Sequence, residues 1–391
     1  MKKIAILLNG EIINDYRVIK IINTLSSIAV IDLFYINGNL TEDSELFKAN
    51  VNLISVNHKT TFWVNFLRHT FFCFEFNFFI KEVLRRKQTY DIIWSNDLPT
   101  LFPAYKLSKK LNSKLVYDSH EIYIETLNQF FPKKSIFFKK IIFEFLLFFM
   151  KKHGNFIENK YVKKTFKFIT VNESLLDYFK EKYNLKHGCA ILNCPVKNFK
   201  DTFFENLSLR KTLNIEHNTK VVIYQGVFNE GRGLRLLIEA FKFLPYDYKL
   251  LLIGSGTLQN DLRYYIIKLN LEHRIFIDFD NFEENYYTCI ADVGVNLLEP
   301  LNLSKKLASP NKVFQYIHAG IPVVLSKSPE NIRILKDFDI GMLTDLNPEN
   351  IAKDIMQVVV RGKSFYKKEI FSARNLYNWQ NEEIKLLNYL L

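Results

Sequence analysis

The amino-acid sequence predicts an α/β protein with parallel sheets, divided into two domains. Short apolar runs alternate with longer segments of helical pattern, which is typical of strand–helix–strand units. A chain of 391 residues is too long for one ordinary core and suits two domains of roughly 150–200 residues each. The alternation also restarts midway, after a polar stretch that ends at Lys220.

The first domain is expected to span residues 1–198. Pro195 cannot continue a central strand, so the boundary is expected in the region 195–215. The expected strands are the apolar runs at residues 4–8, 30–35, 53–56, 92–95, 115–117, 168–171 and 190–192.

The second domain is expected to span residues 199–372. A helix over 235–244 follows its first strand and forms the crossover to the second strand. A helical segment at 373–391 is expected to pack back towards the first domain. The expected strands of this half are the runs at 221–224, 249–253, 275–277, 293–297 and 322–325.

The charge and the cysteine content indicate the class of binding partner and the cellular compartment. A formal net charge of +12 indicates an anionic partner, such as a nucleotide, a nucleic acid or lipid headgroups. No recognisable nucleic-acid-binding module accompanies this charge, so no nucleic acid is expected. The four cysteines show neither CxxC pairing nor a His-supported ligand spacing. We therefore expect no disulfide framework, no metal site and a reducing, cytoplasmic compartment.

No segment is predicted to cross a membrane. The first apolar run meets Asn9, Gly10 and Glu11 before it could serve as the core of a signal peptide. The run 141–150 contains Glu144 and falls far short of the ~20 apolar residues that a spanning helix needs.

Residues 224–234 (YQGVFNEGRGL) follow an expected strand and open an expected helix. Glycines at 226, 231 and 233 let the backbone approach a ligand, and the start of a helix offers free N–H groups and partial positive charge. Arg232 adds a planar cation suited to phosphate oxygens. The loop predicts an anion site, although an ordinary turn with a surface arginine has the same pattern.

Residues 309–320 repeat this arrangement. Pro310 suits the start of a helix, and Gly320 suits its end. Lys312 would lie in the first turn, where the helix dipole favours acidic side chains, so a bound anion explains this cation better. An exposed lysine is the alternative. Gly254 and Gly256 directly follow the expected strand at 249–253 and form a third loop of this kind. Ligands of open parallel sheets bind at the carboxyl ends of the strands, where such loops lie.

These segments resemble glycosyltransferase family 4 (group 1) in an ordered set. The donor half carries YQGVFNEGRGLRLLIEAF, LLIGSGTLQNDL, ADVGVNLL and SPNKVFQYIHAGIPVV. The other half carries NDYRV at 14–18, VYDSHEIYIE at 116–125, TVNESLLDYF and NCP at 193–195. A further match, YNW at 377–379, lies near the end of the chain. The resemblance implies a GT-B fold, in which two facing Rossmann-like domains leave a cleft between them.

The resemblance also implies roles for single residues. Arg232 would contact the donor diphosphate, and Asn311 and Lys312 would hold the donor sugar and phosphate. His120 would face the donor sugar with Glu121 beside it, and Gln315 would contact the ribose. The glycines expected to line the donor site are Gly226, Gly231, Gly233, Gly254 and Gly256.

Two departures from the family pattern concern the donor. Val227 stands where an Arg often follows the first glycine, and the family's paired glutamates would fall on Leu307 and Gln315. Glu299 is too far upstream to replace the first of them. These departures support an alternative, a non-catalytic protein of GT-B fold that binds a sugar nucleotide or glycan.

A metal-dependent transferase of GT-A fold is the other enzyme class considered. Its DxD signature occurs twice, at 278–280 and 337–339, but neither copy follows an early domain where such a site belongs. The resemblance implies instead a retaining transfer without metal or further cofactor, in which a nucleotide-diphosphate sugar is the co-substrate.

Basic and aromatic residues gather in the first domain. Residues 133–167 carry ten lysines against Glu144 and Glu158, and 62–79 is rich in Phe. Such segments can lie on anionic lipid; a buried helix with lysines at its ends is the alternative. We expect a peripheral protein on the inner face of the plasma membrane, which transfers sugar to a glycan or lipid-linked acceptor in surface polysaccharide or lipopolysaccharide assembly.

Overall fold

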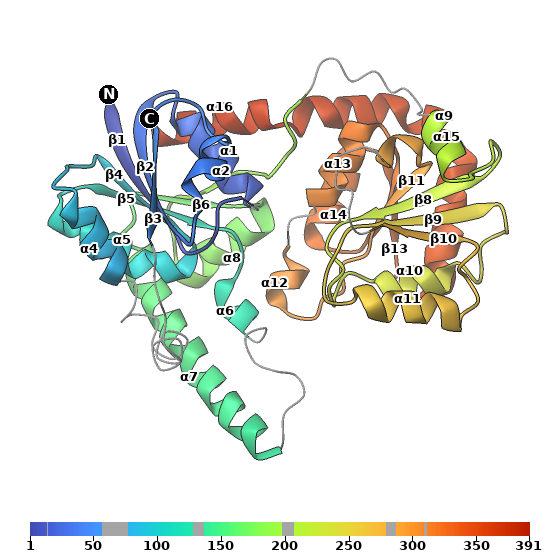
Figure 1. The fold of residues 1–391 in the computed structure, drawn as a ribbon, viewed down its shortest axis with the longest axis horizontal. Coiled ribbons are helices and arrows are strands. Elements are labelled where there is room, and N and C mark those ends of the chain that lie inside the picture. The colour runs from blue at the N-terminus through green and yellow to red at the C-terminus, as the bar shows by residue number, and fades with distance from the viewer. Residues whose placement is uncertain (14, 57–76, 128–136, 198–206, 279–286, 309–310) are drawn as a thin grey trace. The chain divides into compact units, whose positions relative to one another are not determined.

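The computed structural model describes residues 1–13, 15–56, 77–127, 137–197, 207–278, 287–308 and 311–391. The chain forms two compact units (Figure 1). The first comprises residues 1–191 together with 383–391, and the second comprises residues 192–382. The sequence-based bounds of the domains, 1–198, 199–372 and 373–391, stay a prediction.

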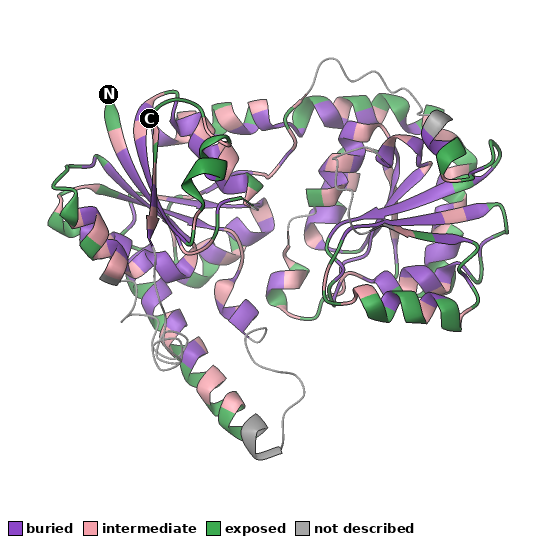
Figure 2. Ribbon diagram, in the orientation of Figure 1, coloured by how far each residue is buried: buried purple, intermediate pink, exposed green. Residues whose placement is uncertain are grey.

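The first unit contains a seven-stranded sheet in the order β3-β2-β1-β4-β5-β6-β7, and its ladders are parallel. Its strands carry continuous apolar runs because both faces of a parallel sheet are covered. Figure 2 shows them as mainly buried. The strands are β1 (Lys2–Leu8), β2 (Ala29–Ile36), β3 (Val51–Val56), β4 (Ile92–Asn96), β5 (Lys114–Ser119), β6 (Lys167–Thr170) and β7 (Cys189–Ala190).

The helices of this unit connect the strands as right-handed crossovers require. Asp15 caps the first helix by accepting a hydrogen bond from the Val18 N–H, and Asn172 caps α8 in the same way through Leu175. The helices are α1 (Tyr16–Leu25), α2 (Leu40–Ser44), α4 (Asn77–Arg85), α5 (Asp97–Lys110), α6 (Tyr123–Thr126), α7 (Phe137–Val162) and α8 (Glu173–Tyr183).

The second unit contains a six-stranded parallel sheet in the order β10-β9-β8-β11-β12-β13. Its strands are β8 (Lys220–Gln225), β9 (Tyr248–Ile253), β10 (Ile275–Asp278), β11 (Val293–Asn296), β12 (Val323–Ser326) and β13 (Gly341–Thr344). Its helices are α9 (Leu207–Thr212), α10 (Leu234–Ala240), α11 (Gln259–Lys268), α12 (Leu303–Lys306), α13 (Asn311–Ala319), α14 (Pro329–Asp337) and α15 (Pro348–Leu376), with the 3₁₀ turn η2 (Thr288–Ile290).

The expected strands are confirmed, and β13 is the strand that the sequence pattern missed. Its run begins with Gly341 and stays half-buried over three of its four residues, so it lacks a strong apolar signature. The helix expected over 235–244 is shorter, because α10 ends at Ala240 and turns follow.

The helical segment expected at 373–391 is interrupted. The long helix α15 ends at Leu376, and a separate helix, α16 (Trp379–Leu390), follows. The Asn378 side chain donates hydrogen bonds to the carbonyl oxygens of Arg374 and Asn375, and it thereby satisfies the end of α15. Residues 383–391 pack within the first unit, where Glu383 accepts a hydrogen bond from the Thr24 hydroxyl at 3.0 Å.

None of the helices in the described ranges is both long and apolar enough to cross a membrane. In each sheet the strands run parallel, so their carboxyl ends meet at one edge. Loops at such edges are where ligands of open α/β sheets bind. Both edges are therefore candidate sites.

Candidate functional site

In the second unit, the loops after β8 and β9 lock together through their backbones. The Gly226 N–H donates to the Ile253 carbonyl at 2.8 Å, and the Phe228 N–H donates to the Ser255 carbonyl at 2.7 Å. Gly256 has φ +156°, and a Cβ there would lie 2.6 Å from the Phe228 carbonyl oxygen. The loops after β8 and β9 therefore come too close together for a side chain at position 256, and only glycine fits there.

The glycine loop before α10 is held by a carboxylate. Gly233 adopts φ +63°, and a Cβ on it would lie 2.5 Å from the Leu297 side chain. Its N–H donates to Glu299 Oε1 at 3.0 Å, and the Glu299 N–H donates to the Gly231 carbonyl at 3.0 Å. One of the N–H groups expected to face a ligand thus binds Glu299. Sequence analysis missed this role, because Glu299 lies far from the loop along the chain.

The two cations expected to hold phosphate gather at the end of β8. The Lys312 side chain lies over Gly226, since a Cβ there would be 2.7 Å from Lys312 Cε and 3.4 Å from the Tyr224 hydroxyl. Burial raises the pKa of Tyr224 to about 12, and the charge of Arg232 opposes this shift. Arg232 therefore lies within electrostatic range of Tyr224, and the Lys312 side chain lies beside the same tyrosine at Gly226.

Gln315 lies on α13 close to these cations. Its Oε1 accepts from Gln225 Nε2 at 3.3 Å, and the Gln225 Oε1 accepts from the Thr288 hydroxyl at 2.7 Å. The amide is thus anchored to the last residue of β8. Asn311 is exposed at the first position of α13, while Ser309 and Pro310 of the same expected loop lie outside the described residues.

In the first unit, His120 is enclosed by two carboxylates. Its Nδ1 lies 3.3 Å from Asp97 Oδ2, and its Nε2 lies 3.3 Å from Asp118 Oδ2. The Arg17 guanidinium donates to Asp118 Oδ1 at 2.9 Å, and Arg17 is itself buried. Glu121 follows His120, is half-buried, and accepts from the Ser119 hydroxyl through its carbonyl.

These charges fix the protonation state of His120. Burial lowers the pKa of His120, but the charges of Asp97 and Asp118 raise it more strongly, to about 9. Burial raises the pKa of Asp118, and the charges of Arg17 and His120 bring it down to about 2. At neutral pH His120 is an imidazolium, so it can donate a proton or a hydrogen bond and cannot act as a base.

Asp97 combines a buried charge with unusual backbone. Burial raises the pKa of Asp97, and the charge of His120 opposes that rise. Asp97 also adopts φ +58°, a left-handed conformation uncommon for a residue with a side chain, and its Oδ1 accepts from the His120 N–H at 2.8 Å. Strained backbone of this kind concentrates at functional sites. Asp97 follows the expected strand 92–95 closely, and that position was the available signal.

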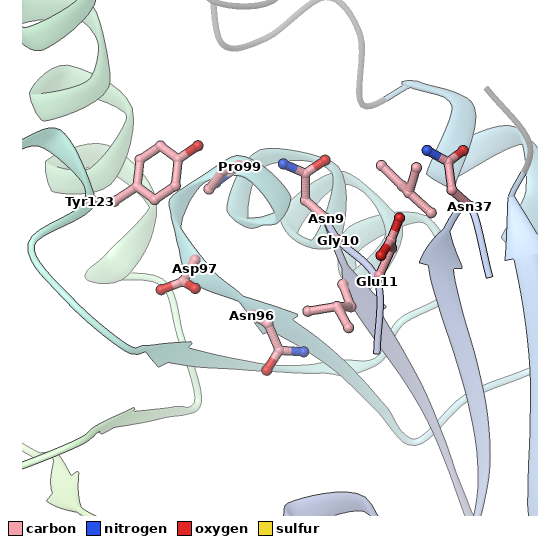
Figure 3. A pocket seen from close by; sticks show the side chains of 10 residues that line it. Asn9, Gly10, Glu11, Asn37, Asn96, Asp97, Pro99 and Tyr123 are labelled. Atoms are coloured by element: carbon pink, nitrogen blue, oxygen red, sulfur yellow. The ribbon is translucent and has the colours of Figure 1, made fainter. Parts of the chain in front are cut away.

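A pocket of about 450 Å³ opens beside Asp97 at the carboxyl ends of β1, β2 and β4. Asn37 and Glu11 lie at one end of this pocket, and Asp97 and Tyr123 lie at the other (Figure 3). None of its residues was among the expected site residues, because the pocket is assembled from separate strand ends.

Residues 206–368 match the family described as Glycosyl transferases group 1. The matched residues lie within the second unit. The matched range includes Arg232, Lys312 and Gln315, together with all five glycines expected at the donor site.

A characterised relative from Campylobacter jejuni is N-acetylgalactosamine-N,N'-diacetylbacillosaminyl-diphospho-undecaprenol 4-alpha-N-acetylgalactosaminyltransferase. It is 26% identical over 149 residues, and this match covers 37% of this chain and 39% of the relative. The match therefore spans about two fifths of each protein.

Solved structures match the whole chain at low sequence identity. HepE from Anabaena, crystallised with UDP and glucose, superposes with a TM-score of 0.74 at 16% identity, and covers 100% of this chain and 99% of its own. WaaG, a glycosyltransferase involved in lipopolysaccharide biosynthesis, gives a TM-score of 0.68 at 13% identity, with 98% of each chain covered. The chain thus has the GT-B fold.

Proposed function

We propose that this protein is a retaining glycosyltransferase that moves a sugar from a nucleoside-diphosphate sugar to a glycan or lipid-linked acceptor. The observation that carries the proposal is the placement of Lys312 and Arg232 around Tyr224, at the end of β8 and within the range that matches the group 1 family. A diphosphate is the chemical group that two cations beside a glycine loop suit best.

In this proposal the bond between the anomeric carbon and the donor phosphate breaks. Negative charge grows on the departing diphosphate, and fixed positive charge lowers the barrier most effectively there. Arg232, Lys312 and the N-terminus of the nine-residue helix α13 supply it without a metal ion. The acceptor oxygen forms the new bond to the anomeric carbon, and the departing phosphate accepts the proton of that hydroxyl.

His120 has a narrower role in this scheme than a general base. With a carboxylate facing each ring nitrogen, it is held as an oriented cation. Its orientation of the donor sugar and the contribution of Glu121 beside it are parts of the proposal. A base at this position would need a neutral imidazole, which the surrounding carboxylates oppose.

The acceptor in this proposal is lipid-linked and belongs to surface polysaccharide or lipopolysaccharide assembly. The names of two similar proteins support it, since the Campylobacter relative acts on a diphospho-undecaprenol glycan and WaaG is involved in lipopolysaccharide biosynthesis. Such acceptors are anchored in a membrane, so the enzyme has to work at its surface.

The helix α7 supports a peripheral position on the inner face of the plasma membrane. Phe145 and Phe148 are 62% and 60% exposed on it, while Glu158 and Met150 are buried. The buried-helix alternative therefore does not describe this part of α7. Lysines at 151, 152, 160, 163 and 164 follow, and exposed aromatic and basic side chains together suit anionic lipid. The expected segment 62–76 and the side chains of 133–140 lie outside the described residues.

The deciding experiment incubates the protein with a panel of sugar nucleotides and measures donor consumption and nucleotide release. Arg232→Ala and Lys312→Ala are expected to lower kcat/KM at least about a hundredfold, as removal of a charge that stabilises a transition state does. Arg235→Ala is the matched control, because this cation is exposed on α10, directly after the loop that contains Arg232, and pairs with Asp261 at 3.9 Å. Full activity in excess EDTA is expected, and its loss would favour a metal-dependent transferase.

The second candidate is a protein that binds a sugar nucleotide or a glycan without turnover. It is favoured by Gln315, whose amide replaces a family glutamate and is hydrogen-bonded to Gln225. Binding of a sugar nucleotide that depends on Lys312, together with no consumption of any donor, would establish this candidate instead.

Membrane association is tested by sedimentation with vesicles of phosphatidylglycerol and phosphatidylethanolamine. Phe145→Ser with Phe148→Ser is expected to weaken binding at least about tenfold, since two apolar side chains leave the lipid. The matched control is Phe365→Ser with Phe371→Ser on α15, where both residues are similarly exposed at 56% and 57%. Equal binding of the two double variants would remove α7 from the proposal.

A further inference from the structure

The pocket beside Asp97 has a lining that suits a sugar. Asn9 and Asn37 present amides, which both donate and accept hydrogen bonds, and Tyr123 adds an aromatic ring (Figure 3). Leu8, Ile36 and Pro99 supply apolar surface between these polar groups. A volume of about 450 Å³ is within the range of small-ligand sites.

The electrostatics of this pocket are unusual for so basic a protein. No Lys or Arg is among the described residues that line it. The neighbouring cluster of Arg17, His120, Asp97 and Asp118 balances two positive charges against two negative ones. Glu11 therefore sets the sign of the charge in the pocket.

Glu11 is placed to act on a ligand. Its side chain is exposed and lies at the same end of the pocket as Asn37. None of the described residues pairs with its carboxylate, in contrast to Asp97. Asp15, which caps α1, contributes a further negative charge nearby, as its influence on His120 shows.

Two residues that line the pocket adopt left-handed backbone. Asn37 at φ +54° and Asp97 at φ +58° both occupy the left-handed region directly after the strands β2 and β4. Asn96 is buried and donates from its side chain to the Leu7 carbonyl at 3.1 Å, which ties the end of β4 to β1. This hydrogen bond holds the end of β4 against β1 at the edge of the pocket.

We propose that this pocket binds the terminal glycosyl unit of the acceptor, a unit with hydroxyl or amide groups and no negative charge, and that Glu11 excludes anionic sugars. This inference rests on the proposed function, since it assigns the acceptor of the same reaction. A carboxylate accepts hydrogen bonds from sugar hydroxyls and repels a carboxylate or phosphate on the ligand. The diphosphate of a lipid-linked acceptor therefore lies outside this pocket.

The test measures binding by saturation-transfer NMR and titration calorimetry, independently of turnover. The probes are the methyl glycosides of glucose, galactose, N-acetylglucosamine and N-acetylgalactosamine, compared with methyl glucuronide and glucose 6-phosphate. At least one neutral glycoside is expected to bind, and the anionic probes are expected to bind at least about tenfold more weakly.

Variants at Glu11 distinguish the effect of its negative charge on ligand affinity from the effect of its side-chain shape. Glu11→Gln keeps hydrogen-bonding capacity, so neutral probes should bind to it within about threefold of their affinity for the wild type. Because the negative charge is gone, the difference in affinity between neutral and anionic probes should disappear. Glu11→Ala should weaken neutral binding about tenfold. Glu45→Gln, an exposed carboxylate of the same unit outside the pocket, should change neither.

The inference is overturned if no neutral glycoside binds, if the anionic probes bind equally well to the wild type, or if Glu11→Gln leaves the difference between neutral and anionic probes unchanged. Donor consumption is measured on the same samples. Selective glycoside binding without donor consumption would refute the proposed function and keep the pocket. Donor consumption without selectivity would refute only the pocket.

Discussion

His120 and Asp97 form a pair in which the ring Nδ1 lies 3.3 Å from a carboxylate oxygen and the backbone N–H donates to the other oxygen at 2.8 Å. One side chain thus fixes both the charge and the position of the histidine. Because Asp97 touches the His120 ring and the pocket at once, it links the two features of the first unit.

Asp97→Asn is expected to lower the pKa of His120 from about 9 by ~1 unit or more, because the amide keeps the shape but removes the charge. NMR titration of the His120 ring measures this shift directly. Asp91→Asn, whose carboxylate accepts from the Lys3 N–H at the other end of the sheet, is the control. An unchanged midpoint in Asp97→Asn would show that Asp97 does not hold the charge.

The charge of His120 makes stability depend on pH in a defined window. Its pKa is raised on folding, so the stabilisation is fully present below pH ~6.5 and is lost as the pH rises through about 9. Urea unfolding of wild type and His120→Gln at each pH should show a difference that shrinks by at most about 3 kcal/mol across this window. A difference that grows with pH would contradict the assignment.

Glu299→Ala is expected to release the loop that contains Gly231 and Gly233. Loss of the charged acceptor leaves the Gly233 N–H unpaired, which costs about 1.5–3 kcal/mol of unfolding free energy. Affinity for a sugar nucleotide should fall in parallel, because Arg232 lies between these glycines. Glu299→Gln keeps an acceptor and should recover most of both losses. If Ala and Gln behave alike, the loop does not depend on this bond.

Gly256→Ala is expected to destabilise the second unit by about 1–3 kcal/mol, through a Cβ that meets the Phe228 backbone at 2.6 Å and a φ of +156°. Thermal and urea unfolding measure the effect. Gly10→Ala is the matched control, because nothing lies within 4 Å of the Cβ it would add. Equal stability of the two variants would show that the loops after β8 and β9 can separate.

The positions of most strands could be predicted from the sequence, whereas only some features of the candidate site could. The apolar runs 4–8 and 221–224 needed only local pattern, since a buried parallel strand is apolar along its length. The loop glycines stand out because they come shortly after such runs, and Lys312 stands out because it lies in the first turn of an expected helix; their role at a donor site stays a prediction. The run 341–344 offered no comparable signal, and the strand β13 was missed.

The partners of the site residues were beyond local pattern. Asp97 stands 23 residues before His120, at the end of the neighbouring strand, and the sequence alone does not show which side chains meet across the sheet. Glu299 is 66 residues from Gly233, and the acidic pocket of Glu11 and Asp97 combines the ends of different strands.

The sequence by itself determined that two parallel sheets form, where most of their strands run, and which loops carry cations beside glycines. The tertiary structure alone decided that His120 is a cation between Asp97 and Asp118, and that Glu299 occupies a loop N–H. The physical reason is range: strand and helix periodicity is set by neighbours along the chain. Charge state and hydrogen-bond partners are set by groups that only folding brings within a few ångströms.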